Sequence, residues 1–181
     1  SSSGFNVSLS WTSPPPYEGT SLELLGTPSS TRQGGDTVDD ATPVTELPAS
    51  LEGTVVGYAD DYDCNDIGTS TSGDVVYSIT PDMDMAVNMT TCFSSYDTKL
   101  FVYENEAGNF AVTTEGEEAC NDDGETGEGC TAWTSRIDGL AMTAGNTYYI
   151  VMDGWAGSEG DYILDIEGYN PLAGFTVWTV D

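Results

Sequence analysis

The sequence predicts an all-β fold, specifically a jelly-roll-like antiparallel β-sandwich with one extra strand near each terminus. From about residue 53 onward, short segments alternate between apolar and polar residues with a period of two, as half-buried strands do. Turn-forming residues separate these segments at short intervals. No segment shows sustained helical periodicity, so we expect little helix.

Residues 1–34 form an N-terminal extension rich in Ser, Thr, Pro and Gly. The segment 5–11, FNVSLSW, alternates cleanly, and the prolines at 14–16 end it because proline donates no ladder hydrogen bond. We interpret 5–11 as a candidate donor strand and the remainder as a linker, with a second short apolar segment at 21–26. The apolar positions of the donor strand, which we predict to contact another subunit, are Phe5, Val7, Leu9 and Trp11.

Residues 35–169 contain the predicted sandwich. The candidate strands are 54–59, 74–80, 85–92, 99–105, 109–114, 135–143, 147–153 and 161–169, with turns at 104–109 and 154–161. A further strand-like run, FTVWTV, lies in the C-terminal segment 170–181. The residues predicted to face the core are Val75, Tyr77, Ile79, Met85, Val87, Met89, Leu100, Val102, Tyr148, Ile150, Met152, Tyr162, Leu164 and Ile166.

The charge of the chain restricts its partners. Only Arg32, Lys99 and Arg136 are basic, against 31 acidic residues, so the formal net charge is −28. Such a polyanion is repelled by nucleic acids and by anionic lipid, and no apolar run approaches the ~18 residues needed to cross a bilayer. We therefore expect neither nucleic-acid binding nor membrane insertion. A well-solvated surface suited to a saline medium is the simplest explanation of the overall acidity.

The chain contains no histidine, which removes the commonest general base and most zinc sites. Paired carboxylates of the kind used in glycoside hydrolysis will arise by chance in so acidic a chain. The Asp-Thr/Ser-Gly signature of aspartic proteases is absent. We therefore predict a protein that is not an enzyme.

The four cysteines, Cys64, Cys92, Cys120 and Cys130, lack metal-binding spacing and predict two disulfides. Three pairings are open, and we favour Cys120–Cys130, which closes a short loop, together with Cys64–Cys92. Disulfides predict an extracellular or cell-surface location. No signal peptide is present, so we expect the sequence to be the form left after export. Two sequons make Asn6 and Asn88 candidate glycosylation sites.

Two acidic clusters are candidate calcium sites, because calcium prefers carboxylate and carbonyl oxygens. The first lies in the loop 57–66, GYADDYDCND, and contains Asp60, Asp61 and Asp63, with no basic residue nearby in the sequence. It begins like an EF-hand but lacks the Gly and Glu that this motif requires. The second lies between Cys120 and Cys130 and contains Asn121, Asp122 and Asp123, with Asp153 as a further candidate. A solvated, disulfide-held acidic loop is the alternative in both places.

Residues 34–166 resemble the bacterial pre-peptidase C-terminal domain family. The likeness is carried by GDTVDDATPV, GDVVYSITPDMD, SSYDTKLFVYEN followed by CNDDG, and GLAMTAGNTYYIVMDGWAGSEGDYILDI. The resemblance implies a secreted, non-catalytic β-sandwich. Related collagen-binding modules bind calcium where the linker enters the sandwich, which corresponds by position to Asp36, Asp60, Asp61 and Asp63. The linker here reads RQGGD instead of an acidic run, and the aromatic residues that contact collagen cannot be matched, so collagen binding is not implied.

Three functions remain open, of which the least specific is a calcium-stabilised spacer or other secreted domain. An amphipathic strand in the extension can add to the sheet edge of another copy, which predicts a homopolymeric surface fibre stabilised by calcium and disulfides. The alternative is an accessory module of a secreted hydrolase that binds a glycan or protein, in which Trp155, in a Gly-rich turn, is the aromatic residue to examine.

Overall fold

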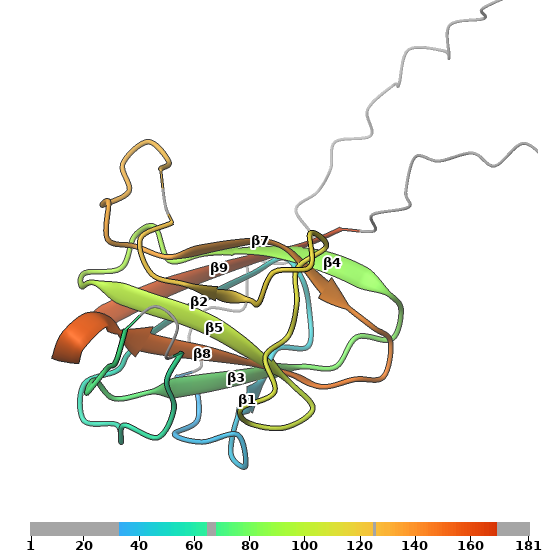
Figure 1. The fold of residues 1–181 in the computed structure, drawn as a ribbon, viewed down its shortest axis with the longest axis horizontal. Coiled ribbons are helices and arrows are strands. Elements are labelled where there is room, and N and C mark those ends of the chain that lie inside the picture. The colour runs from blue at the N-terminus through green and yellow to red at the C-terminus, as the bar shows by residue number, and fades with distance from the viewer. Residues whose placement is uncertain (1–32, 65–67, 125, 170–181) are drawn as a thin grey trace, which may run out of the picture.

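In a computed structural model of the chain, residues 33–64, 68–124 and 126–169 are described, and they form two β-sheets packed as a sandwich (Figure 1). The all-β prediction is confirmed. The predicted donor strand, the sequon at Asn6 and the C-terminal segment lie outside the described residues. Gln33 and Gly34, which we assigned to the extension, already contact the sandwich: Gln33 bonds to Thr54, and Gly34 packs closely against Val75.

The first sheet has five strands in the order β1-β3-β8-β5-β6, and the second has four in the order β2-β9-β4-β7. All pairs are antiparallel except β1 with β3. The five strands are β1 (Thr42–Pro43), β3 (Val75–Ile79), β8 (Tyr148–Gly154), β5 (Thr98–Glu104) and β6 (Cys120–Asn121). The four strands are β2 (Ala49–Thr54), β9 (Asp161–Tyr169), β4 (Met85–Thr90) and β7 (Arg136–Met142). A short 3-10 helix, η2 (Trp155–Gly157), follows β8.

The core lies between the two sheets and is built from the alternating apolar positions. Every residue predicted to face the core does so: all are buried in one apolar cluster except Met85, which is partly buried against it. Since side chains alternate across a strand, the polar neighbours of these residues point to the other face. The two turns that we predicted at 104–109 and 154–161 are also present, the first with Asn105 and Gly108 at positive φ.

The outer face of the five-stranded sheet carries a second apolar cluster, which includes Val76, Phe101, Tyr103 and Val151. Loop residues cover it, among them Val38 and Ala41 from the segment before β1 and Tyr62 from the acidic loop. Both faces of this sheet are therefore buried, which explains why the burial of β5 is almost continuous rather than alternating.

Two predicted strands are wrong. The strand expected at 54–59 is replaced by β2, which ends at Thr54; Gly57 then takes a positive φ and the Tyr58 N–H turns back to donate to the Val55 carbonyl. The segment 109–114 makes only isolated bridges, because it crosses from β5, where Phe110 pairs with Tyr103, to β7, where Thr113 pairs with Leu140.

The four cysteines form two disulfides as predicted, but the favoured pairing is wrong. The bonds are Cys64–Cys120 and Cys92–Cys130. Short loop closure favoured Cys120–Cys130, but Cys120 lies in β6 of the five-stranded sheet, facing the acidic loop, whereas Cys130 lies beside Cys92, which follows β4 of the other sheet. Only Cys120 lies in a strand, and the pairing follows from which loop meets it: the acidic loop with Cys64, and not the loop that carries Cys130. Two disulfides indicate a non-cytoplasmic protein.

Candidate functional site

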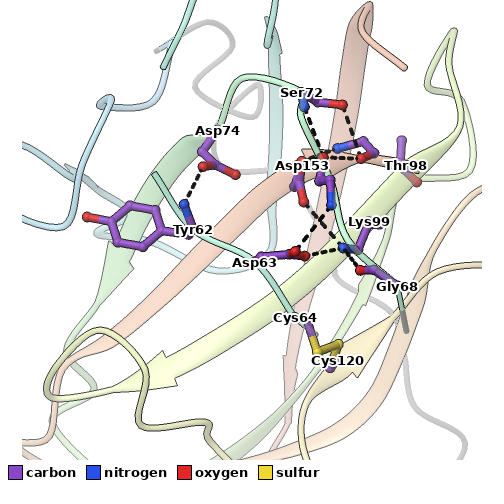
Figure 2. A network of polar contacts seen from close by, with 12 residues as sticks. Tyr62, Asp63, Cys64, Gly68, Ser72, Asp74, Thr98, Lys99, Cys120 and Asp153 are labelled. Atoms are coloured by element: carbon purple, nitrogen blue, oxygen red, sulfur yellow. Dashed lines mark hydrogen bonds and ion pairs between the residues drawn. A yellow bond between two sulfur atoms is a disulfide. The ribbon is translucent and has the colours of Figure 1, made fainter. Parts of the chain in front are cut away.

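A buried lysine lies beneath the acidic loop. Lys99 is fully buried, and its ammonium contacts the Asp63 carboxylate, donates to the Gly68 carbonyl at 2.7 Å and lies 3.6 Å from Asp153 Oδ2 (Figure 2). The strand register places it there, since Lys99 in β5 pairs with Asp153 in β8. A buried charge is tolerated only when it is paired and hydrogen-bonded, and Lys99 meets both conditions.

A further buried carboxyl group, Asp74, lies beside Asp153 in this network. Asp74 directly precedes β3, whose first residue pairs with Met152, so Asp74 lies beside Asp153. Burial, reinforced by the charge of Asp153, raises the pKa of Asp74 to about 8. Burial likewise raises the pKa of Asp153 to about 7, against the opposing effects of hydrogen bonds from Ser70 and Gly154 and of the charge on Lys99. One oxygen of each, Asp74 Oδ1 and Asp153 Oδ2, accepts no hydrogen bond from the described residues.

The acidic loop is held by backbone donors as well as by Lys99. Asp74 Oδ2 accepts from the Asp61 and Tyr62 N–H groups, each at 2.7 Å, and Asp63 Oδ2 accepts from the Ser70 N–H at 3.2 Å. The Cys64–Cys120 disulfide fixes the loop to β6 (Figure 2). The loop therefore stays together although its sequence offers no basic neighbour.

The predicted ligands of the first calcium site are not gathered around one point. Asp36 Oδ1 accepts from the Ala59 N–H at 2.9 Å, Asp60 and Asp61 are exposed, and the cation that contacts Asp63 is Lys99. Calcium binding by this loop stays a prediction. The sequence analysis did not identify Lys99 as a site residue. Its spacing could have indicated the role, because Lys99 falls on the same face of β5 as the apolar residues that point outward.

Part of the second predicted cluster does come together, with a partner that we did not predict. Asp122 and Asp123 lie beside Asp97, and one carboxylate oxygen from each lies within 4.8 Å of the others. Within the described ranges, this is the one group of three acidic, cysteine or histidine side chains with that spacing. Oδ1 of Asp97 and Oδ1 of Asp122 are buried and accept no hydrogen bond from the described part of the chain.

Mutual repulsion is visible in the pKa values of this cluster. Burial, followed by the charges of Asp123 and Asp97, raises the pKa of Asp122 to about 6. Burial and the charge of Asp123 also raise the pKa of Asp97. The charge of Lys99 opposes the rise in the pKa of Asp122. The three carboxylates form an oxygen-only donor set of the kind that calcium prefers, so the residues fit this ion chemically.

The other candidate ligands of this cluster point elsewhere. Asn121 Oδ1 accepts from the Arg136 N–H at 2.8 Å, and Asp153 belongs to the lysine network. Asp97 directly precedes β5 and lies at the end of the sandwich where the loop after β6 begins. Asp97 could have been assigned to this cluster only from the strand order, because that order decides which strand ends lie together. The sequence alone did not supply the strand order.

Exposed aromatic side chains lie at the same end. Trp133 and Trp155 are 54% and 38% exposed, and their backbones bond directly to the residues around the cluster: Thr98 N–H donates to the Trp133 carbonyl and Trp155 N–H to the Asp97 carbonyl. Phe93, 60% exposed, follows Cys92 of the second disulfide. This end of the molecule therefore combines carboxylates with apolar rings.

Comparison with known proteins gives no assignment: no family model matches the chain, and no curated protein is significantly similar to it. No helix among the described residues has the length and apolar character needed to cross a membrane. At the described sequon, Asn88 Oδ1 accepts from the Gly139 N–H at 2.8 Å, and glycosylation there stays a prediction.

Proposed function

We propose that the protein is a non-catalytic extracellular structural subunit, related to the pre-peptidase C-terminal domains, whose copies join into a surface fibre. The joint is β-strand addition: residues 5–11 of one copy pair with a sheet edge of the next. The observation that carries the proposal is the openness of the sandwich. Its two sheets do not close into a barrel, so the described part of the chain presents four edge strands, β1, β6, β2 and β7, and edge strands are templates for pairing with another chain.

The distribution of charge supports the same function. Residues 1–32 contain two acids and one base, whereas the whole chain has a net charge of −28, so nearly all of the negative charge lies after residue 32. Residues 5–11 contain no charged side chain. A polyanionic sandwich repels its own copies, but an uncharged strand can dock without adding to that repulsion.

The internal polar contacts support a structural rather than a catalytic role. The contacts of Lys99 with Asp63 and Asp153 fix the acidic loop to the sheet, and the Cys64–Cys120 disulfide fixes the same loop covalently. The chain also contains no histidine, the commonest general base.

Calcium is part of the proposal at the cluster of Asp97, Asp122 and Asp123. Burial, followed by repulsion between the carboxylates, raises the pKa values of Asp97 and Asp122. An ion there would compensate both effects and would link the start of β5 to the loop after β6. The other oxygen ligands that calcium requires would come from water and backbone carbonyls.

Electron microscopy and light scattering of the parent chain and of a variant lacking residues 1–13 test the function. The parent is expected to form polymers, and the deletion variant is expected to be a monomer with an unchanged melting temperature. If both are monodisperse monomers at high concentration, the fibre function is refuted.

A second function is favoured by the exposed rings of Phe93, Trp133 and Trp155 near the carboxylate cluster. Aromatic platforms beside calcium ligands suit sugar stacking, so a glycan-binding accessory module is the competing candidate. Calorimetric titration with soluble polysaccharides distinguishes the two functions. The module function requires binding that Trp133→Ala and Trp155→Ala abolish and that deletion of residues 1–13 leaves intact.

A further inference from the structure

Of the four edges in the described part of the chain, only β2 has the length to accept a strand and is not covered by other described residues along that length. β1 and β6 span two residues each. β7 is covered by the preceding loop, since the Ala141 N–H donates to the Val112 carbonyl and the Thr114 N–H to the Gly139 carbonyl. β2, Ala49–Thr54, pairs with β9 on one side alone.

The outward backbone groups of β2 can be identified from its end. Thr54 bonds away from β9 through both its N–H and its carbonyl, whereas the next N–H, that of Val55, donates to Gly160 at the start of β9. Because backbone groups alternate along a strand, the N–H and carbonyl groups of Ser50 and Glu52 also point away from β9. Neither residue has a backbone partner on that side among the described residues.

Gln33 already occupies one position on this edge. Its side-chain amide donates to the Thr54 carbonyl at 2.7 Å and accepts from the Thr54 N–H at 3.0 Å. A residue of a neighbouring antiparallel strand would make the same two bonds, one with its N–H and one with its carbonyl. Gln33 therefore satisfies the outward N–H and carbonyl groups of Thr54. The outward groups of Ser50 and Glu52 keep no such partner among the described residues.

Apolar side chains before and at the start of β2 are not fully covered. Val44, which follows β1, Leu47, which precedes β2, and Ala49, its first residue, are only partly buried against the core. A strand added to β2 would cover them if its inward side chains were apolar and alternated with polar ones. Residues 5–11 have this pattern and carry no charge.

We infer that the outward backbone edge of β2, at Ser50 and Glu52, receives residues 5–11 of a second copy of this chain. This inference rests on the proposed function and specifies its acceptor site. The chain before Gln33 is long enough to reach a second copy and longer than a direct return to the same edge needs. The 21 residues from Thr12 to Arg32 can extend to about 70 Å at roughly 3.3 Å per residue, whereas a hairpin return needs only about 2–5 residues. The prolines at 14–16, directly after the strand, also favour an extended spacer over a turn.

Two full-length variants test the inference by complementation. Glu52→Pro removes an outward N–H without losing a bond to β9, so this variant keeps its donor strand but lacks an acceptor edge. Leu9→Pro disables the donor strand and keeps the acceptor edge. Each variant alone is expected to be a monomer, and an equimolar mixture is expected to form a dimer that grows no further. Glu52→Thr, which changes the side chain and keeps the N–H, is the matched control and is expected to polymerise like the parent.

The outcomes separate this inference from the proposed function. If Glu52→Pro polymerises like the parent while Leu9→Pro does not, copies still join by residues 5–11 but β2 is not the acceptor. If the parent itself never polymerises, the proposed function fails.

Melting curves check that each variant is folded, and amide exchange in the parent polymer gives a second readout. Exchange is expected to be roughly a hundredfold slower at Ser50 and Glu52 than in Leu9→Pro, and unchanged at Leu51 and Gly53, whose N–H groups face β9. A monomeric parent with slow exchange at Ser50 and Glu52 would show that the strand folds back on its own copy and would overturn the inference.

Discussion

Lys99 and Asp153 lie opposite each other on paired strands, and together with Asp63 they form the buried charge centre that fixes the acidic loop to the five-stranded sheet. The loop, the lysine and the nearby disulfide thus form one structural unit. We expect this unit to dominate the stability of the sandwich, since removal of one partner leaves the others buried without compensation.

Replacing Lys99 by Met should therefore be strongly destabilising. We expect the free energy of unfolding to fall by about 3–5 kcal/mol, because Asp63 and Asp153 lose the cation that contacts them. Denaturant unfolding measures the effect. Arg136→Met is the matched control: its side chain is 41% exposed in its ion pair with Asp138, so we expect a change within about 1 kcal/mol. Equal effects in the two variants would contradict the role given to Lys99.

The buried acids predict a distinctive pH dependence. The pKa of Asp74 is raised to about 8 and that of Asp153 to about 7, so between pH 4 and pH 8 the folded protein binds more protons than the unfolded chain. The stability contributed by these groups is therefore present at low pH and is lost as the pH rises towards 8. The melting temperature is therefore expected to fall as the pH is raised from 4 to 8. Asp74→Asn, which stays neutral, should flatten the curve, and an unaltered slope in this variant would exclude Asp74 as the source.

The disulfide pairing is directly testable by mass spectrometry. Proteolysis without reduction should release linked peptides containing Cys64 with Cys120 and Cys92 with Cys130. These bonds span sequence separations of 56 and 38 residues. Each is expected to stabilise the fold by about 4 kcal/mol, because it lowers the conformational entropy of the unfolded chain. Recovery of Cys120 linked to Cys130 would refute the pairing.

Calcium binding is expected to raise the melting temperature through Asp97, Asp122 and Asp123. Calorimetric titration should detect one site, and a chelator should reverse the shift. Asp122→Asn should abolish both effects by removing one of the gathered carboxylates. The control is Asp138→Asn, an exposed acid outside the cluster, which should bind calcium like the parent. No heat and no thermal shift in the parent would exclude a resident ion here.

The core could be predicted from the sequence because strand periodicity depends only on local spacing. Tyr148, Ile150 and Met152 in β8 show this: their alternation alone placed them correctly. The site was harder, since Asp97 meets Asp122 only through the order in which strands pair. The favoured disulfide pairing was wrong for the same reason. Loop entropy favoured Cys120–Cys130, but the strand order places Cys120 in the five-stranded sheet, where it bonds to Cys64. Strand β2 was missed because Gly53 and the preceding Pro48 interrupt its pattern.

Cryo-electron microscopy of native material tests the central claim most directly. Our account predicts a polymer in which residues 5–11 of each copy run along Ser50 and Glu52 of its neighbour. Isolated monomers, or a strand that lies against its own molecule, would contradict it.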